Sequence, residues 1–260
     1  MKNLIFQYWN GRVNNCAKES KKTMEKYAAK IGAEYYFAEN ANWSKTHGAY
    51  YDAFRPVYDD MFLEYDNVLY LDMDVFAMDG FEDNIFDEQV EYVGICEEML
   101  QPWIRETMTV GGCINAKNDE LWEQCLQQLT PLKLPRDSKG RHRIFNSGVV
   151  LYTNAGLRKC REKFIPFADY VNTVARAGLG RFYQLDQNYL NCNLFNGTIE
   201  PTIIDNRFNA QIHYIRGDKP GINDERKGRK CLVHMQLSGS NDWDAQQLWE
   251  KVNMPVSLWK

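Results

Sequence analysis

The sequence predicts an α/β fold in which helices flank both faces of a central, mostly parallel sheet. Short apolar runs that end at turn residues alternate along the chain with longer segments whose apolar residues recur at helical spacing. One run, residues 68–71, is continuously apolar, as expected of a central strand that is covered on both faces. With 260 residues, of which 44% are hydrophobic and 25% charged, the chain can bury a sizeable core.

The N-terminal part of the chain alternates between predicted strands and predicted helices. Asn10-Gly11 ends the first apolar run, and Gly32 closes the first helical segment. In chain order, the expected elements are strand 4–9, helix 15–31, strand 34–38, helix 48–64, strand 68–71 and strand 90–96.

The remainder continues this alternation with shorter strands. We expect Thr153 or Asn154 to cap a long helix, because both side chains can accept a hydrogen bond from a helix N-terminus. The expected elements are helix 119–129, strand 145–153, a helix from 154 into the 170s, helix 185–193, strands 199–204, 212–215 and 231–235, and helix 244–252. Two basic stretches, 131–143 and 216–230, are expected to be long loops.

The net charge and the cysteines exclude several classes of protein. Thirty-five acidic and 31 basic residues give a net charge of −4, which does not fit a protein that binds nucleic acid or an anionic membrane. No apolar stretch is long enough for a membrane span or a signal peptide. Seven cysteines are scattered without a C-x-x-C pair, so we expect reduced thiols in a cytoplasmic protein.

A pair of carboxylates directly follows the apolar run 68–71. Asp72 and Asp74 are two residues apart, so both side chains face the same side if the chain stays extended. The end of a central parallel strand is also where open α/β sheets bind ligands. A divalent cation offsets the repulsion between two carboxylates and can bridge them to a phosphate. This D-x-D pattern therefore favours a metal and phosphate site.

The D-x-D pattern alone leaves two other interpretations open. The aspartates could be a solvated pair at the start of a loop. The strand could also open a haloacid-dehalogenase-like phosphatase, in which the first aspartate is a nucleophile. That motif carries Thr or Val four residues after the first aspartate, whereas this chain has Phe76 there, and the strand lies well inside the chain.

Further polar features accompany the D-x-D pattern in a fixed order along the chain. They are Arg55 before the D-x-D strand, Asn146-Ser147-Gly148 at the opening of strand 145–153, Asp186-Gln187 at the start of helix 185–193, and His234 after the apolar Cys231-Leu232-Val233. Taken in this order, the set resembles the nucleotide-sugar glycosyltransferases of the GT-A fold. The resemblance is closest to the retaining group that includes glycogenin and the bacterial lipopolysaccharide galactosyltransferases, and it covers about residues 45–240.

The resemblance implies a single GT-A-type domain over residues 1–260. Residues 1–110 would form the nucleotide-binding half, which includes the D-x-D pattern, and residues 111–260 the acceptor and catalytic half. It also implies that Asp72, Asp74 and His234 are metal ligands. Imidazole beside carboxylates suits Mn²⁺ better than Mg²⁺, which remains the alternative ion.

The resemblance assigns roles to the remaining polar residues of the set. Asn146 and Asp186 would hold the hydroxyl groups of the donor sugar, and Gln187 would lie beneath its anomeric carbon; these three are the expected catalytic residues. Arg55 would contact the donor or steady the D-x-D loop. The other expected donor-binding residues are Gln7, Tyr8, Met73 and Ser147.

This chain departs from the family pattern at two places. The family has a polar residue after the first strand that holds the base, whereas this chain has Gln7-Tyr8-Trp9, whose rings could stack on a base instead. The family also has a lysine after the late histidine that contacts the diphosphate, and no lysine follows His234 at that spacing. A basic residue of the 216–230 stretch, such as Lys219 or Arg226, could replace it, or the metal could suffice.

The resemblance predicts a metal-dependent glycosyltransferase that moves a hexose from a nucleoside diphosphate sugar, expected to be a UDP-sugar, to an acceptor hydroxyl with retention. A glycan or another hydroxyl compound would be the acceptor. The alternative is a catalytically silent protein that keeps the fold and binds a nucleotide or a sugar. No nucleic acid partner is expected.

Overall fold

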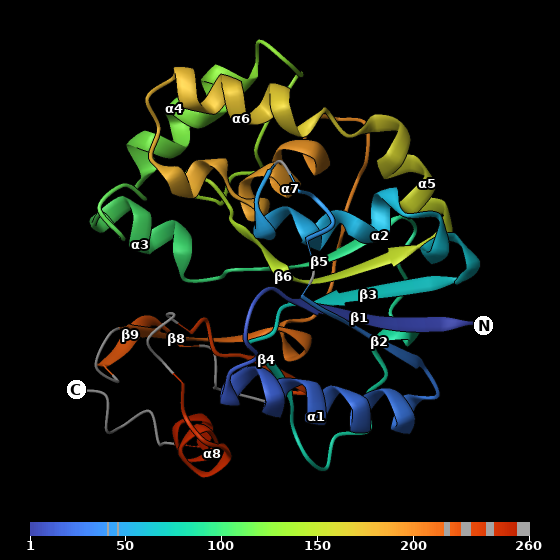
Figure 1. The fold of residues 1–260 in the computed structure, drawn as a ribbon. Coiled ribbons are helices and arrows are strands. Elements are labelled where there is room, and N and C mark those ends of the chain that lie inside the picture. The colour runs from blue at the N-terminus through green and yellow to red at the C-terminus, as the bar shows by residue number, and fades with distance from the viewer. Residues whose placement is uncertain (41, 46, 216–218, 225–229, 238–241, 254–260) are drawn as a thin grey trace.

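A six-stranded mixed sheet crosses the middle of the molecule and carries helices on both faces (Figure 1). The computed structural model describes residues 1–260 except 41, 46, 216–218, 225–229, 238–241 and 254–260. In spatial order, the strands are β2 (Glu34–Glu39), β1 (Asn3–Trp9), β3 (Asn67–Leu71), β6 (Phe145–Thr153), β5 (Val93–Glu97) and β7 (Thr202–Ile203). The predicted α/β class is therefore confirmed.

Most neighbouring strands of this sheet are parallel, and β6 is the exception. β1 pairs in parallel with β2 and β3, and β5 with β7. β6 runs antiparallel to both β3 and β5. The N-terminal end of β6 therefore lies beside the C-terminal end of β3, where Leu71 pairs with Val149.

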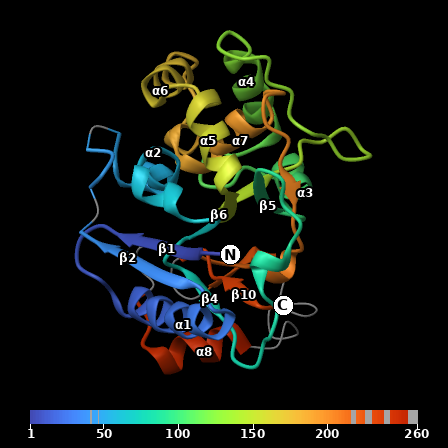
Figure 2. The same ribbon diagram turned by 90° about the vertical axis from the view of Figure 1, so that its right-hand side faces the viewer.

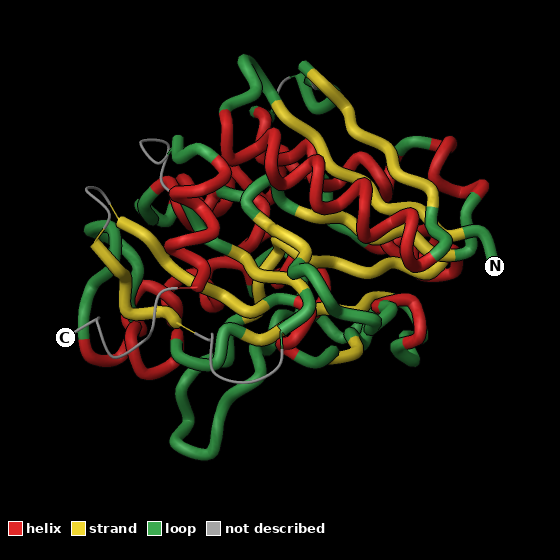
Figure 3. The backbone as a smooth tube through the Cα atoms, turned by 90° about the horizontal axis from the view of Figure 1, so that it is seen from below, coloured by secondary structure: helices red, strands yellow, loops and turns green. Residues whose placement is uncertain are grey.

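Helix α1 (Asn15–Ile31) covers the lower face of the sheet (Figures 1 and 3). The side chain of Asn14 caps its start by accepting a hydrogen bond from the N–H of Ala17. Gly32 ends it in the left-handed conformation, at φ +70°, and donates its N–H to the carbonyl of Ala28. Met24 and Tyr27 of α1 are buried against the sheet, in one cluster with Ile5 of β1.

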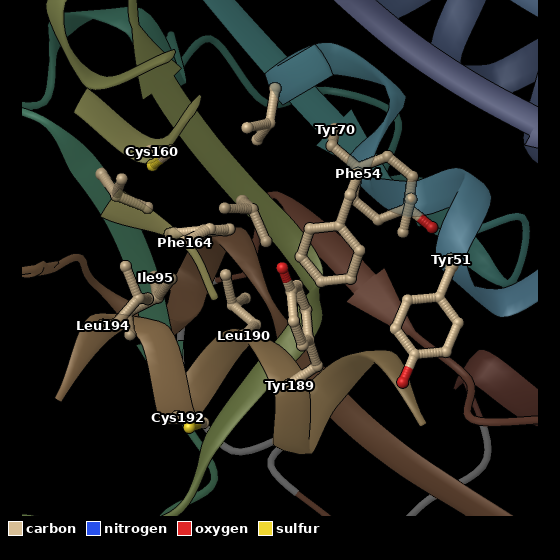
Figure 4. Close-up of a cluster of buried hydrophobic side chains, with 14 of the residues drawn as sticks. Tyr51, Phe54, Tyr70, Ile95, Cys160, Phe164, Tyr189, Leu190, Cys192 and Leu194 are labelled. Carbon is tan, nitrogen blue, oxygen red and sulfur yellow. The ribbon is translucent and has the colours of Figure 1, made fainter. Parts of the chain in front are cut away.

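The upper face carries most of the remaining helices and the largest apolar cluster (Figures 1 and 4). They are α2 (Arg55–Tyr58), α3 (Gln101–Thr107), α4 (Ala116–Leu126), α5 (Asn154–Lys163), α6 (Phe167–Arg176) and α7 (Asp186–Leu194). Tyr189 of α7 lies at the centre of the aromatic contacts, with ring centroids 4.8 Å from Phe54 and 5.6 Å from Tyr51. This packing anchors α7 to the segment before β3, and it thereby fixes the start of α7 relative to the end of β3.

A smaller sheet of four strands continues from the end of β3. Its order is β4 (Val75–Ala77), β10 (Leu232–His234), β8 (Ala210–Ile215) and β9 (Lys219–Asp224). β10 runs antiparallel to β4, and the two lie side by side below the central sheet (Figure 2). Helix α8 (Ala245–Asn253) packs on this sheet through Leu248 and Val252. Of the helices in the described residues, none is both long and apolar enough to cross a membrane.

Two predicted helices are interrupted in the structure. The expected helix 48–64 is a 3₁₀ turn (Ala49–Phe54), then α2, then a second 3₁₀ turn (Asp60–Glu64). Pro56 lies in the first turn of α2, a position that proline tolerates. Asp59 is extended between α2 and the second 3₁₀ turn, and its side chain caps that turn. The expected helix from 154 into the 170s is broken at Pro166 into α5 and α6. Thr153 caps α5, as predicted, by accepting from the N–H of Gly156.

The expectation that the basic stretches 131–143 and 216–230 are long loops needs correction, because one is tied to α4 and the other contains a strand. In 131–143, Arg136 pairs with Glu120 and Glu123 of α4, and Arg136 and His142 form an isolated bridge. In 216–230, residues Lys219–Asp224 form β9, which pairs antiparallel with β8. Arg226 and the remainder of that stretch, apart from Lys230, lie outside the described residues.

Leu190 tests the packing of α7 on the sheet. It is 1% exposed within the aromatic cluster (Figure 4), so we expect Leu190→Ala to lower the free energy of unfolding by about 2–5 kcal/mol. Leu129, which is 39% exposed, is the matched control. Leu129→Ala should change the free energy of unfolding by less than about 1 kcal/mol. Denaturant unfolding of both variants measures the difference, and equal effects would contradict this account of the core.

Candidate active site

Two carboxylates and one imidazole converge where the two sheets meet. The ligand-type atoms of Asp72, Asp74 and His234 all lie within 4.8 Å of one another. His234 Nε2 is 3.2 Å from Asp74 Oδ1 and 3.9 Å from Asp72 Oδ2. Tyr70 donates its hydroxyl to Asp72 Oδ1 at 2.5 Å. The geometry is that of a site for one divalent cation with mixed oxygen and nitrogen ligands.

A turn brings the two aspartates together, not the extended chain that their spacing suggested. The N–H of Val75 donates to the carbonyl of Asp72 at 3.2 Å, so the chain folds back directly after β3. It then enters β4, and the pairing of β4 with β10 sets His234 opposite Val75. Residues more than 150 positions apart in the sequence thus meet through the three-residue strand β4.

The backbone after His234 holds Asp74 in place. The N–H of Met235 donates to the carbonyl of Asp74, and the N–H of Leu237 donates to its carboxylate Oδ2 at 2.9 Å. Between them, Gln236 has φ +43°, an uncommon conformation for a residue other than glycine. Such backbone strain is typical of functional sites, where surrounding contacts maintain it.

The three charges shift one another's pKa values. Burial, and next the nearby Asp74 carboxylate, raise the pKa of Asp72 to about 7. Burial opposes ionisation of Asp74 as well, but His234 and the backbone N–H groups lower its pKa below the ordinary value. For His234, burial alone lowers the pKa, whereas Asp74 and Asp72 outweigh it and the net pKa is raised. The metal-free centre therefore holds protons that a cation would replace.

Each residue of Asn146-Ser147-Gly148 has a distinct place in the site. A Cβ at Gly148 would lie 2.4 Å from His234 Cε1 and 2.8 Å from Asp72 Oδ2, so only glycine fits beside the cluster. Ser147 donates its hydroxyl to Asp186 Oδ2 at 2.8 Å. Asn146 donates to Glu98 Oε1 at 2.9 Å and to Gln187 Oε1 at 3.3 Å. The predicted motif thus links the end of β3 to the start of α7.

The cluster lies on the wall of a pocket of about 650 Å³. Aromatic rings form one part of the lining, with Tyr8 and Tyr70 stacked at a centroid distance of 6.0 Å. Asp186 contributes a further carboxylate, whose pKa burial raises above its ordinary value. The pocket therefore extends beyond Asp72, Asp74 and His234, and aromatic, amide and carboxylate side chains line the rest of it.

Most of the predicted site residues line this pocket, and two do not. Those that line it are Tyr8, Asp72, Met73, Asp74, Asn146, Ser147, Asp186, Gln187 and His234. Gln7 is fully buried beneath the site, where its Nε2 donates to the carbonyl of Asp72 and its Oε1 accepts from Tyr35. Arg55 is bound to Asp59 and to the hydroxyl of Tyr36, away from the pocket. Gln7 and Arg55 therefore do not line the pocket.

The sequence analysis missed two residues that line the pocket and one that is buried behind His234. Glu98 lines it and is 3% exposed; it follows the predicted strand 90–96 at the same sheet edge as Asp72, which was a usable signal. Arg105 also lines it, with its guanidinium bound to Asp119 at 2.9 Å. Asn209 is fully buried, and its Oδ1 lies 3.1 Å from His234 Nδ1. It lies in an irregular segment before β8, and no local pattern marked it.

A second cluster with the same kinds of side chain lies on α4 and the 131–143 stretch. It contains Glu120, Glu123 and His142. Arg136 binds both carboxylates there, at 2.7 Å from Glu120 Oε1 and 2.9 Å from Glu123 Oε2. The guanidinium already supplies the positive charge, so this cluster needs no metal.

Comparisons with known proteins agree with the geometry. The family described as "Glycosyl transferase family 8" matches residues 6–235. No curated protein sequence matches the chain. Among solved structures, the fold is similar to a glycosyltransferase involved in the glycosylation of the major capsid of PBCV-1, with a TM-score of 0.53, 13% identity and 97% of each chain covered. It is also similar to the WbbM bifunctional glycosyltransferase, with a TM-score of 0.58, 11% identity, and coverage of 96% of this chain and 49% of that one.

At these identities, the solved structures establish the fold alone. That fold is the GT-A type that the sequence predicts, with the mixed sheet and flanking helices described above. Nothing in the matches favours the haloacid-dehalogenase-like phosphatase that the D-x-D pattern left open.

The raised pKa values predict how metal affinity depends on pH. A cation must replace the protons on Asp72, whose pKa is raised to about 7, and on His234, whose pKa is also raised. Protons compete below these pKa values and not above them, so we expect the Mn²⁺ affinity to rise by at least about tenfold from pH 6 to pH 8. Titration calorimetry at both pH values measures the change, and a flat profile would contradict the assignment of these ligands.

Proposed function

The chain belongs to glycosyl transferase family 8, and we propose that within this family it transfers a hexose from a UDP-sugar to an acceptor hydroxyl, with a divalent cation and with retention of configuration. One observation carries the proposal. A cation site of two carboxylates and an imidazole shares one pocket with the carboxylate of Asp186 and the amide of Gln187. The cation site suits the diphosphate of a nucleotide sugar, and the carboxylate and the amide suit the hydroxyl groups of its hexose.

Asp72, Asp74 and His234 fit a divalent cation, and we propose Mn²⁺. Their ligand atoms are close enough to share one ion, and the space beside them is kept open by Gly148. When bound, the cation supplies positive charge that stabilises the diphosphate leaving group as the glycosidic bond breaks. The two aspartates and the imidazole would hold it, and the strained segment at Gln236 keeps Asp74 in position through the N–H of Leu237.

The aromatic part of the pocket suits the base of the donor. Tyr8 and Trp9 line the pocket beside Asn10 and Asn14, which offer amide groups. An aromatic ring can stack on a pyrimidine, and amides can donate to and accept from its polar edge. We propose that these residues take the place of the polar residue that the family has after its first strand.

The amide and carboxylate part of the pocket suits the sugar. Asp186 begins α7, and the hydroxyl of Ser147 holds its carboxylate at the pocket, a position that suits it to bind sugar hydroxyls. Gln187 follows it, with its Oε1 held by Asn146. We propose that Gln187 lies beneath the anomeric carbon, where an amide oxygen can face the positive charge that develops on the sugar ring.

Asp74 tests the dependence on the cation. We expect Asp74→Asn to abolish Mn²⁺-dependent UDP binding and to leave the fold intact, because a neutral amide is a poorer ligand than a carboxylate. Calorimetric titration of UDP with and without Mn²⁺ measures this. Asp79→Asn is the matched control, since Asp79 is an exposed aspartate just beyond β4. Unchanged metal-dependent affinity in Asp74→Asn would remove the cation from this position.

A donor-hydrolysis assay on the same proteins separates the proposal from the silent alternative. The wild-type enzyme should release UDP from its donor in the presence of Mn²⁺, whereas a silent protein of this fold would bind and not turn over. Binding without release, across a panel of UDP-hexoses and acceptors, would favour the silent protein.

The stereochemistry of the product tests retention. An inverting reaction needs a carboxylate base on the face opposite the leaving group, whereas in a retaining reaction the departing phosphate can take the acceptor proton on the same face. The amide of Gln187 is too weak a base for inversion, so we expect an α-linked product from an α-linked donor. Proton NMR of the first-formed product distinguishes the two by the anomeric coupling. A β-linked product would overturn retention and leave Asp186 or Glu98 as the candidate base.

A further inference from the structure

A chain of buried hydrogen bonds connects His234 to a carboxylate on the other side of the site. His234 Nδ1 lies 3.1 Å from Asn209 Oδ1, and Asn209 Nδ2 donates to Asn146 Oδ1 at 3.0 Å. Asn146 Nδ2 in turn donates to Glu98 Oε1 at 2.9 Å. All four side chains are at most 4% exposed. A network that is buried to this extent must have each donor matched to an acceptor.

Two groups at Asn146 fix which side chain donates and which accepts at every step of this hydrogen-bond network. The backbone N–H of Gly148 can only donate, and it lies 2.8 Å from the side-chain oxygen of Asn146. On the other side of the amide, Oε1 of Glu98 accepts from the side-chain nitrogen of Asn146. Asn146 therefore has one permitted orientation, with its oxygen toward Gly148 and its nitrogen toward Glu98.

The orientation of Asn146 determines that of Asn209, and Asn209 determines the proton on His234. Since Asn146 Oδ1 accepts, Asn209 must present its NH₂ group there and turn its oxygen toward the imidazole. An oxygen at that place requires a proton on His234 Nδ1. In a neutral ring, the other nitrogen, Nε2, is then unprotonated, and Nε2 is the nitrogen that faces Asp72 and Asp74.

Without this hydrogen-bond network, the carboxylates of Asp72 and Asp74 would favour the His234 tautomer that is protonated at Nε2. Asp74 Oδ1 lies 3.2 Å from Nε2 and would attract a proton to it. A proton on Nε2 blocks the lone pair that a metal needs. The metal centre thus needs a second acceptor on the far side of the ring, and Asn209 is in that position.

We propose that Asn209 and Glu98 are positioning residues of the metal centre, which act through Asn146 to keep the neutral His234 ring protonated at Nδ1 and leave Nε2 as the ligand. Their contribution to catalysis rests on the proposed function, whereas the ring tautomer is a property of the metal-free protein. Neither residue touches the cation.

Nitrogen-15 NMR of the metal-free protein reads the tautomer directly. The chain has four histidines, so the ring signals can be assigned by single substitutions. In the wild type, at a pH where the ring is neutral, we expect a protonated Nδ1 and a bare Nε2 for His234. In Asn209→Leu, which keeps the shape and removes the acceptor, we expect the proton to move to Nε2. The affinity for Mn²⁺, measured by calorimetry, should fall by roughly 10- to 100-fold in that variant.

One conservative variant should keep the behaviour of the wild type. In Glu98→Gln, an amide oxygen still accepts from Asn146. This variant should keep the proton on Nδ1 and an Mn²⁺ affinity within a few-fold of the wild type.

Asn193→Leu controls for a general loss of stability. Asn193 is also fully buried, and its amide bonds to the carbonyl of Tyr189 and the N–H of Ile165, within the α7 packing. We expect this variant to lose stability without a change in the His234 tautomer or in Mn²⁺ affinity.

A wild-type ring protonated at Nε2 overturns the proposal even if Asn209→Leu does not fold. An unchanged tautomer and affinity in a folded Asn209→Leu overturn it as well. Absence of sugar transfer by the wild-type protein would count against the proposed function and leave the NMR result unaffected, so the two failures are distinguishable.

Discussion

Repulsion between Asp72 and Asp74 is the constraint on which the rest of the site depends. Burial, and next the Asp74 carboxylate, raise the pKa of Asp72 to about 7, so the pair needs compensating charge and hydrogen-bond donors. The surrounding chain supplies both: the hydroxyl of Tyr70, the N–H of Leu237 and the imidazole of His234 all face the pair. Glycine at position 148 leaves the space in which these groups meet. The positions of Asp72 and Asp74 thus explain why a histidine and a glycine are needed beside them.

Comparison with the cluster around Arg136 shows why the two acidic clusters differ in function. Glu120 and Glu123 both bind the guanidinium of Arg136, so a cation of the protein itself already lies between them. Among the residues that the structure describes, Asp72 and Asp74 pair with His234, and they open onto a pocket of about 650 Å³. An acidic cluster that is balanced internally stabilises a loop, whereas one that faces a pocket is suited to an exchangeable cation.

The sequence predicted the parts of this site that depend on local pattern. Asp72, Asp74 and Asn146 could be found because each adjoins an apolar strand, and the strand ends of an α/β sheet are where ligands bind. The resemblance placed Arg55 on a helix before the D-x-D strand. In the structure, Pro56 and the extended Asp59 interrupt the expected helix 48–64, and the guanidinium of Arg55 is bound to Asp59. Asn209 could not be found, because its position depends on how β8 and β10 pair and not on its neighbours in sequence.

The direction of β6 explains how Asn146-Ser147-Gly148, at the start of one strand, meets the D-x-D pair at the end of another. The D-x-D pair comes after β3, whereas Asn146-Ser147-Gly148 opens β6. In a wholly parallel sheet these two segments would lie at opposite edges, about 30 Å apart for a strand of nine residues. Because β6 is antiparallel to β3 and β5, its first residues lie beside the last residues of both, and Cys96 pairs with Asn146. The reversed strand therefore brings Glu98, Asn146 and Asp72 to one edge. The candidate site thus depends on the mixed sheet, since a β6 that ran parallel to β3 and β5 would carry Asn146 to the opposite edge.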